Sequence, residues 1–490
     1  MAYAVRTVHV NKYHPLFDYC HTLTALTNNL YNAALFRQRQ VMTAVKKDES
    51  LWSSHEKDVM DELRNALPLM NRKNRMPDVK HFLLNRFFLD DLMRHTWNPD
   101  YFAPGLPRQT AQQTLASVCR SMKSFFSSIR EWKKNPSAFT GKPELPGYRH
   151  KRGHSAACIT NQDAVIKYIG GRMFIKLPLT NIRVDIGPSS DIGKLKEVQI
   201  VPGNGEYTLT VITEKDFDVS LISDTPERIS SIDAGVDNLM AVANNCSLPC
   251  ILYKGGIVKS INQWYNKSLS SVMSKQTMSS GKRFRPSDES NALTIRRNNQ
   301  MNDLLHKVSK HFIAWCVENR IDTVVFGANR YWKQNISIGH TNNQNFVQIP
   351  FFKLKNILKY LCERHGIRFI EQEESYTSRA SFPDRDFIPV YGKEPEEYSF
   401  SGRRRPVRYK GVYKPDGFRG LYTTKNGTVI NSDLNGSANI LRKAFPDAFD
   451  EKQELDFANV MIVRHPDAMK IQALKERQTE KNRQRKLCAA

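Results

Sequence analysis

Long apolar runs and cysteines are both scarce in this sequence. No run of about 18 apolar residues occurs, so no membrane-spanning helix is predicted. The first residues lack a charged segment followed by a long apolar core, so we expect no secretory signal. Only eight cysteines occur among 490 residues, at irregular spacings. This pattern excludes a disulfide-rich secreted scaffold and favours reduced thiols in the cytosol.

Acidic residues are also too few to balance the basic ones. Lys and Arg number 73 against 49 Asp and Glu, and the formal net charge is +24. Such an excess favours binding to phosphate backbones, because neutralised phosphates release their condensed counterions. Solubility is the simpler alternative explanation of the charge.

The first half of the chain combines strand-like and helical patterns. Alternating apolar residues predict a strand near residues 3–10, and apolar residues spaced three, four and seven apart predict helices within 20–135. Prolines and glycines end this pattern near Asn135, and short strand-like segments follow until about residue 213. We therefore expect an antiparallel barrel or sheet that includes the N-terminal strand, with the helical block inserted into it.

From Ile229 onward the pattern becomes α/β. The expected elements are two strands over 229–244, a helix over 290–320, a buried strand at 323–326, a helix over 350–365 and a strand over 367–371. This alternation predicts a parallel or mixed sheet covered by helices. We expect helix over 446–490, where 470–486 holds seven Lys and Arg against two Glu; this segment is either a solvated helix face or a flexible basic arm.

Two aspartates stand at the ends of apolar segments in this half. Asp233 follows an apolar strand, and Asp433 precedes a predicted helix. Carboxylates at such positions are typical of a Mg²⁺ site, where paired ions about 3.5–4 Å apart activate water and stabilise the leaving oxygen of a phosphodiester. A turn residue at Asp233 and a helix N-cap at Asp433 are the structural alternatives.

The segments around these aspartates resemble the TnpB proteins, RNA-guided nucleases encoded by insertion sequences. The residues that carry the resemblance are IDAGVDNLMAV around Asp233, INSDLNGSANILRK around Asp433, Tyr376-Thr377-Ser378, LHKVSKHF at 305–312 and FTGKPELPGY at 139–148. The resemblance covers most of residues 100–445. Compact type V CRISPR effectors share the same motifs.

The resemblance implies an α+β multidomain protein. It combines a RuvC (RNase H-like) α/β nuclease domain with an N-terminal β-barrel that carries an inserted helical recognition domain. The implied domains are a wedge-like barrel at 1–20 and 136–224, a helical recognition domain at 21–135, a RuvC-like domain at 225–375 and 425–446, an inserted target-nucleic-acid-binding segment at 376–424 and a basic tail at 447–490.

One departure from the family concerns the third carboxylate. The second RuvC motif usually ends its strand with Glu, but here Gly327 stands in that position. The form Glu-x-x-Thr-Ser found in some relatives matches Glu374, which we therefore expect to complete the metal site with Asp233 and Asp433. Glu373 and Glu371 are the alternative candidates for the third metal ligand. The purely structural alternative is that these glutamates form a solvated acidic end of the strand.

A second departure concerns zinc. The family's cysteine pairs after the Tyr-Thr-Ser motif are absent, and no cysteine follows Ser378 until Cys488. We therefore expect Mg²⁺, as two ions, and no zinc. The insert still carries the basic residues Arg403, Arg404, Arg405 and Arg408 among aromatic ones. This pattern suits contacts to a single strand, although a solvated loop would look the same.

Basic residues before the nuclease motifs are candidate nucleic-acid contacts. They are Arg120, Lys123 and Arg130 on a predicted helix, and Lys142 and Tyr148 in the proline-rich segment that follows. A guide RNA–DNA duplex would be held there by its shape, while base pairing supplies the sequence specificity.

Together these features predict an RNA-guided DNA endonuclease of the prokaryotic cytosol. The expected partners are a guide RNA and target double-stranded DNA, without a membrane; the protein is expected to act as a monomer with its RNA, and a dimer is the alternative. Gly327 keeps open an RNA-guided DNA-binding protein without cleavage. An unguided RuvC-like resolvase or transposase would leave the more than 220 residues before Asp233 unexplained.

Overall fold

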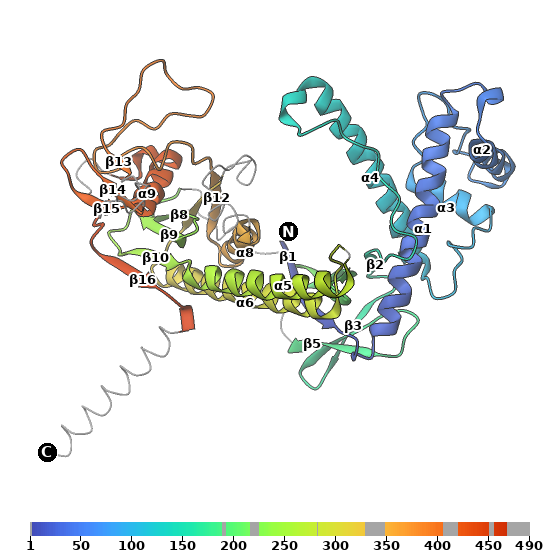
Figure 1. Ribbon diagram of the computed structural model, residues 1–490, viewed down its shortest axis with the longest axis horizontal. Helices are drawn as coiled ribbons and strands as arrows, with labels where there is room; N and C mark the ends of the chain where they lie inside the picture. The colour runs from blue at the N-terminus through green and yellow to red at the C-terminus, as the bar shows by residue number, and fades with distance from the viewer. Residues whose placement is uncertain are drawn as a thin grey trace. The chain divides into compact units, whose positions relative to one another are not determined.

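The computed structural model describes residues 2–188, 193–215, 225–281, 283–328, 348–404, 420–449 and 455–467. The chain divides into two compact units, residues 1–216 and 217–490 (Figure 1). None of the described helices is long and apolar enough to cross a membrane.

Two antiparallel sheets form the base of the first unit. The four-stranded sheet has the order β1-β7-β6-β2, with β1 (Ala2–Val10), β7 (Glu206–Lys215), β6 (Lys194–Gly203) and β2 (Ala157–Thr160). The second sheet is β3 (Val165–Ile169), β4 (Arg172–Lys176) and β5 (Arg183–Pro188). Ala2 pairs with Lys215 and Val10 with Tyr207, so the N-terminal strand lies beside the last strand of the unit.

Four helices lie in sequence between β1 and β2. They are α1 (Phe17–Ala44), α2 (Ser54–Ala66), α3 (Arg86–His95) and α4 (Arg108–Lys134). A capping box starts α2, where Ser53 and Glu56 satisfy each other's backbone N–H. Figure 1 shows α4 and α2 on either side of the long helix α1. The helices and sheets of this unit share one apolar core.

A six-stranded mixed sheet forms the centre of the second unit. Its order is β12-β11-β8-β9-β10-β16, with β12 (Arg368–Gln372), β11 (Thr323–Gly327), β8 (Ile229–Asp233), β9 (Asn238–Asn244), β10 (Cys250–Lys254) and β16 (Val460–Val463). β8, β11 and β12 are parallel, and β9 is antiparallel to β8 and β10. The carboxyl ends of β8, β11 and β12 therefore meet at one edge of the sheet.

Helices cover both faces of this sheet. Because strand side chains alternate in direction, Val324 and Phe326 pack under α6 (Asp288–Glu318) and α8 (Phe351–Arg364), whereas Val325 packs under α9 (Ser432–Ala444). The helix α5 (Gly256–Ser280) runs beside α6 (Figure 1). The predicted helix-covered mixed sheet is present.

The prediction of helix over 446–490 is wrong in part. Val460–Val463 forms β16, which pairs in parallel with β10 from Cys250↔Val460 to Tyr253↔Val463. The reason is local composition, because this short apolar run is rich in β-branched residues and can bury Val463 against the sheet. The basic segment 470–486 lies outside the described residues.

A small sheet joins the insert to the central domain. β13 (Arg403–Arg404), β14 (Leu421–Thr423) and β15 (Val429–Asn431) pair in that order, all antiparallel. The last strand leads directly into α9, which starts at Ser432. The insert is therefore tied to the element that carries Asp433.

Candidate active site

Asp233 and Gly327 are neighbours at the carboxyl edge of the sheet. Ile232 pairs with Phe326, so the next residues, Asp233 and Gly327, lie side by side. On the other side of β11, Gly327 pairs with Gln372, the last residue of β12. Glu374 follows two residues later, so its side chain can reach back over Gly327.

The carboxylate of Glu374 occupies the space beside Gly327. A Cβ atom placed on Gly327 would lie 2.8 Å from Glu374 Oε2 and 2.5 Å from Ile440 Cδ1. Glycine is thus needed at this position for the carboxylate to pack where it does. The glycine that departs from the expected second motif leaves room for an acid from the turn after β12.

Asp433 stands in the first turn of α9 and is not the helix cap. The cap is Asn431, whose Oδ1 accepts hydrogen bonds from the N–H groups of Asp433 (3.0 Å) and Leu434 (3.1 Å). This corrects the structural alternative in which Asp433 itself caps the helix. Its carboxylate is left for other partners.

Close packing of α9 on β8 brings the two aspartates together. A Cβ atom on Gly436 would lie 2.6 Å from Asp233 Oδ2, so glycine permits the helix to approach the carboxylate. At the next residue, Ser437 Oγ donates to the carbonyl of Ser231 (3.0 Å), and Ser231 Oγ donates to the carbonyl of Ser437 (2.7 Å). These buried serines hold the helix at the strand that ends in Asp233.

One amide group and one guanidinium group contact the Asp433 carboxylate. Asn238 Nδ2 donates to Oδ2 at 2.8 Å, and the Arg404 guanidinium lies 3.5 Å from Oδ1. Asn238 is itself oriented by Lys254, whose Nζ donates to its Oδ1 at 2.9 Å. The carboxylate is therefore held from two sides by β9 and by the insert.

The three carboxylates influence one another electrostatically. Burial raises the pKa of Asp233 well above its usual value, the charges of Glu374 and Asp433 raise it further, and Arg404 opposes the rise. Mutual repulsion of this kind, in a set of oxygen donors only, suits a hard divalent cation such as Mg²⁺. In the described ranges no three His, Cys, Asp or Glu side chains stand close enough to ligate one ion as they are arranged.

Glu371 and Glu373, the two alternative candidates for the third carboxylate, each form an ion pair with a lysine. Glu371 pairs with Lys355 at 2.8 Å. Glu373 accepts from Lys443 Nζ at 2.6 Å and from the Ser375 N–H at 2.6 Å. Burial opposes the ionisation of Glu373, but these hydrogen bonds outweigh it and lower its pKa. Of the three glutamates, the structure brings only Glu374 to Asp233.

The buried Lys443 ammonium binds several groups of the turn that carries Glu374, and we call this set of contacts the Lys443 clamp. Its side chain is 8% exposed, and besides Glu373 it donates to the carbonyls of Ser375 (3.0 Å) and Pro389 (3.2 Å). Because Lys443 belongs to α9, one side chain ties the Glu374 turn to the helix that carries Asp433.

Buried polar contacts hold the start of the insert, where the family's cysteines are missing. Asn435 and Asn439 of α9 both donate to the carbonyl of Ala380, at 2.8 and 2.7 Å. Asp386 accepts from the N–H groups of Ser381 (2.7 Å) and Ser401 (3.0 Å). The fold of this segment thus has its own hydrogen-bonded framework.

The remaining predicted contact residues lie on exposed surfaces. Arg120, Lys123 and Arg130 are exposed on α4, Lys142 lies over the ring of Trp132 at 5.8 Å, and Tyr148 stacks with Arg39 at 4.8 Å. Arg403 is exposed on β13. Arg405 and Arg408 lie outside the described residues, as do 329–347. Arg404, predicted to contact nucleic acid, lies beside Asp433 instead of pointing away from the carboxylates.

Sequence reasoning missed Asn238, Gly436 and Lys443. Asn238 could have been found, because a polar residue at the start of an otherwise apolar strand beside an acidic motif needs a partner. Gly436 and Lys443 carry no such local signal, since their contacts depend on how α9 packs.

Two family models match this unit, which holds the mixed sheet and the three carboxylates. Residues 218–333 match OrfB_IS605, described as "Probable transposase", and residues 351–440 match the Cas12f1-like TNB domain. The first match includes Asp233 and Gly327, and the second includes Glu374 and Asp433. The matches confirm the predicted resemblance: the chain is similar to the TnpB proteins and to compact type V CRISPR effectors, families of RNA-guided DNA nucleases.

Solved structures with similar chains include two type V effector complexes. The Cas12f1–sgRNA–target DNA complex is 12% identical, with 86% of this chain and 82% of that chain covered and a TM-score of 0.46. The AacC2c1–sgRNA–extended non-target DNA ternary complex is 8% identical, with 86% and 70% covered and a TM-score of 0.35. No curated protein matches the sequence.

Proposed function

We propose that this protein is an RNA-guided, Mg²⁺-dependent endodeoxyribonuclease that cuts double-stranded DNA next to a short flanking motif. The observation that supports this best is that Glu374 and Asp433 lie near enough to the buried Asp233 to raise its pKa, with Glu374 in the space that Gly327 leaves open. These residues come from three distant parts of the chain.

The architecture of the second unit supports a RuvC-like domain at 225–375 and 425–446. Its first strand ends in Asp233, two antiparallel strands follow, and two parallel strands extend the sheet on the other side. In this proposal 376–424 is the inserted target-binding segment, and 447–490 is a tail whose first part adds β16.

In the proposed reaction Asp233, Glu374 and Asp433 would hold two Mg²⁺ ions. Bound ions of this kind activate water and stabilise the leaving oxygen of a phosphodiester. The chain's own residues orient the carboxylates in advance, since Asn238 fixes one oxygen of Asp433. The Arg404 guanidinium is placed to contact a phosphate oxygen and to offset negative charge that develops on it.

The first unit would bind the guide RNA and its duplex with the target strand. Exposed Arg120, Lys123 and Arg130 follow one helix, and Lys142 and Tyr148 lie in the segment after it. Such side chains contact the backbone by charge and shape. With a net charge of +24, binding should weaken steeply with salt, by a slope near −0.9 per neutralised phosphate. We propose a monomer bound to its RNA.

An RNA-guided binding protein without cleavage would be the main alternative. It was suggested by Gly327, which cannot ligate a metal. The position of Glu374 argues against that alternative, because an acid from the turn after β12 packs beside Gly327 and can take the role of the missing carboxylate.

Sequencing the RNA that copurifies with the protein, followed by a cleavage assay on matching DNA, tests the proposal. The gene is expressed with its native flanking DNA, and the RNA that copurifies is sequenced. A duplex that matches the variable end of this RNA should be cut in Mg²⁺ by the wild type and left intact by Asp233→Ala. Binding without cleavage by the wild type would establish the roadblock function, and cleavage that needs no RNA would indicate an unguided nuclease.

A further inference from the structure

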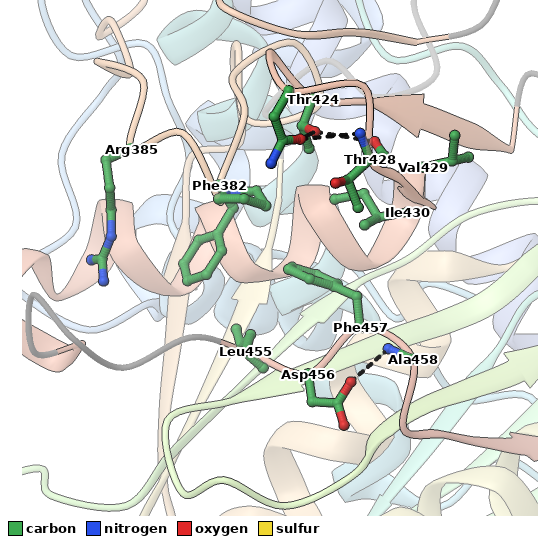
Figure 2. Close-up of a pocket in the computed structure, with 12 residues that line it drawn as sticks. Phe382, Arg385, Thr424, Thr428, Val429, Ile430, Leu455, Asp456, Phe457 and Ala458 are labelled. Carbon is green, nitrogen blue, oxygen red and sulfur yellow. Dashed lines mark hydrogen bonds between the residues drawn. The ribbon is translucent and has the colours of Figure 1, made fainter.

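A cavity of about 580 Å³ lies in the second unit, apart from the carboxylates. Three segments line it: 382–385 after the Tyr-Thr-Ser motif, 424–430 in the β14–β15 hairpin, and 455–458 before β16 (Figure 2). We call it the hairpin pocket. Its volume is in the range of small-ligand sites and would admit one nucleotide.

Aromatic rings form one wall of the hairpin pocket. Phe382 is 2% exposed and packs edge-on against Phe457, with the ring centroids 5.9 Å apart at 73°. Figure 2 shows the two rings next to each other, with Leu455 beside them. The ring of Phe382 also packs against that of Phe449, with the ring centroids 4.8 Å apart. Phe457, in contrast, is only half-buried. Phe457 therefore offers ring surface to a planar ligand.

The hairpin forms a polar wall opposite the rings. Thr424 Oγ1 and the Thr428 N–H both donate to Asn426 Oδ1, at 2.5 and 3.1 Å. Because the turn uses the oxygen twice, the orientation of the exposed amide is fixed, and its Nδ2 is left as a donor. In the segment before β16, the exposed Asp456 uses Oδ1 to accept from the N–H groups of Ala458 and Asn459, at 2.9 and 3.2 Å, which leaves its second oxygen as an acceptor.

A cation lies at the edge of the aromatic wall. The Arg385 guanidinium is 5.7 Å from the centroid of Phe382, and the residue is exposed. A ring surface, fixed donors and acceptors, and an adjacent guanidinium match the base, the base edge and the phosphate of one nucleotide.

The pocket is mechanically connected to the candidate active site. The Phe382 N–H donates to Asn435 Oδ1 at 2.9 Å, two residues after Asp433 on α9. Ile430, which lines the pocket and is 7% exposed, precedes Asp433 by three residues. The lining of the pocket is therefore tied directly to the helix that carries Asp433.

We infer that the hairpin pocket holds one unpaired base of single-stranded DNA, with Arg385 on the neighbouring phosphate. The inference rests on the proposed function, because the DNA strand held there is the one to be cut. It names a subsite that anchors the substrate beside the site of cleavage.

Binding to a defined oligonucleotide tests the pocket without any cleavage. Full-length Asp233→Ala protein in EDTA is titrated with a fluorescent 15-nucleotide single-stranded DNA. Phe457→Ala should weaken binding about 5- to 150-fold, the range expected for one stacked base. Arg385→Ala, at an exposed position, should reduce the salt slope by about one. Phe352→Ala, at a ring that is 69% exposed on α8, is the matched control and should bind unchanged.

Photocrosslinking locates the bound base. DNA that carries 5-iododeoxyuridine should crosslink to Phe457 or Phe382, and the crosslink should disappear in Phe457→Ala. Crosslinks confined to other residues, together with unchanged binding by both variants, would overturn the inference. Tighter binding of an RNA of the same sequence would also overturn it, in favour of a guide-binding role. Because cleavage is not measured, neither result depends on whether the wild type is a nuclease.

Discussion

Replacing Gly327 with alanine should slow DNA cleavage strongly, because the added methyl group displaces the side chains beside it. The added Cβ would meet Ile440 Cδ1 at 2.5 Å, Glu374 Oε2 at 2.8 Å and the Ile232 carbonyl at 3.3 Å. Ordinary contacts need about 3.5 Å, so the isoleucine tip must move by about 1.0 Å and the Glu374 oxygen by about 0.7 Å. Both atoms end side chains that can move, and the Ile232 carbonyl needs a shift of only about 0.2 Å to reach the same separation.

The expected cost to stability is therefore modest, whereas the cost to cleavage is large. Overpacking of this kind costs about 1–3 kcal/mol, which lowers the melting temperature by about 2–4 °C per kcal/mol in a domain of this size. Misplacing a reacting group by about 1 Å costs on the order of 10²-fold in rate. We predict that Gly327→Ala slows cleavage about 100-fold while the protein stays folded.

Single-turnover cleavage of a matched duplex in Mg²⁺, beside a thermal melt of the same sample, measures both quantities. Gly256→Ala is the control, because a Cβ there meets no atom within 4 Å, and it should match the wild type in rate. A Gly327→Ala protein that melts lower but cuts at the wild-type rate would refute the reasoning, since Glu374 would then not act at this position.

Two further changes probe the surroundings of the site and the first unit. Lys443→Met should slow cleavage tenfold or more, because the turn through Glu373 and Ser375 loses its clamp, while filter binding of DNA stays unchanged. Burial and the neighbouring His21 lower the pKa of His154, so protonation below about pH 6.5 favours the unfolded chain and stability is lost as the pH falls. The loss of melting temperature between pH 7.5 and pH 5.5 should therefore be smaller in His154→Asn than in the wild type.

The Lys443→Met prediction has a control variant, and both predictions have an outcome that would contradict them. Lys355→Met removes the pair with Glu371, outside the clamp, and should leave the rate near that of the wild type. If both lysine variants slow cleavage equally, general destabilisation is the cause. An equal pH dependence in His154→Asn and the wild type would show that other groups govern acid stability.

The strands of the second unit and its two aspartates could be predicted from the sequence for a simple reason. Buried parallel strands are continuous apolar runs, and an acid that ends such a run must lie at the sheet edge. Asp233 is therefore visible in the sequence as a site residue. The turn after Gln372 carries no such rule, so three glutamates stayed open until the partners of Glu371 and Glu373 separated them from Glu374.

Long-range packing accounts for what the sequence did not reveal. β16 is a four-residue strand whose partner, β10, lies about 200 residues earlier, and no local pattern encodes that pairing. Arg404 belongs to a run of arginines that resembles any nucleic-acid-binding loop. Its place beside Asp433 follows from the pairing of β13 with β14, which only the folded insert shows.

Cleavage by Glu374→Gln tests the central claim most directly. The substitution keeps the shape and removes the charge, so folding and guide-dependent DNA binding should persist. We predict that Glu374→Gln cuts a matched duplex in Mg²⁺ no better than Asp233→Ala, while Glu371→Gln cuts like the wild type. If Glu374→Gln cuts at the wild-type rate, the third carboxylate lies elsewhere and the proposed site is wrong.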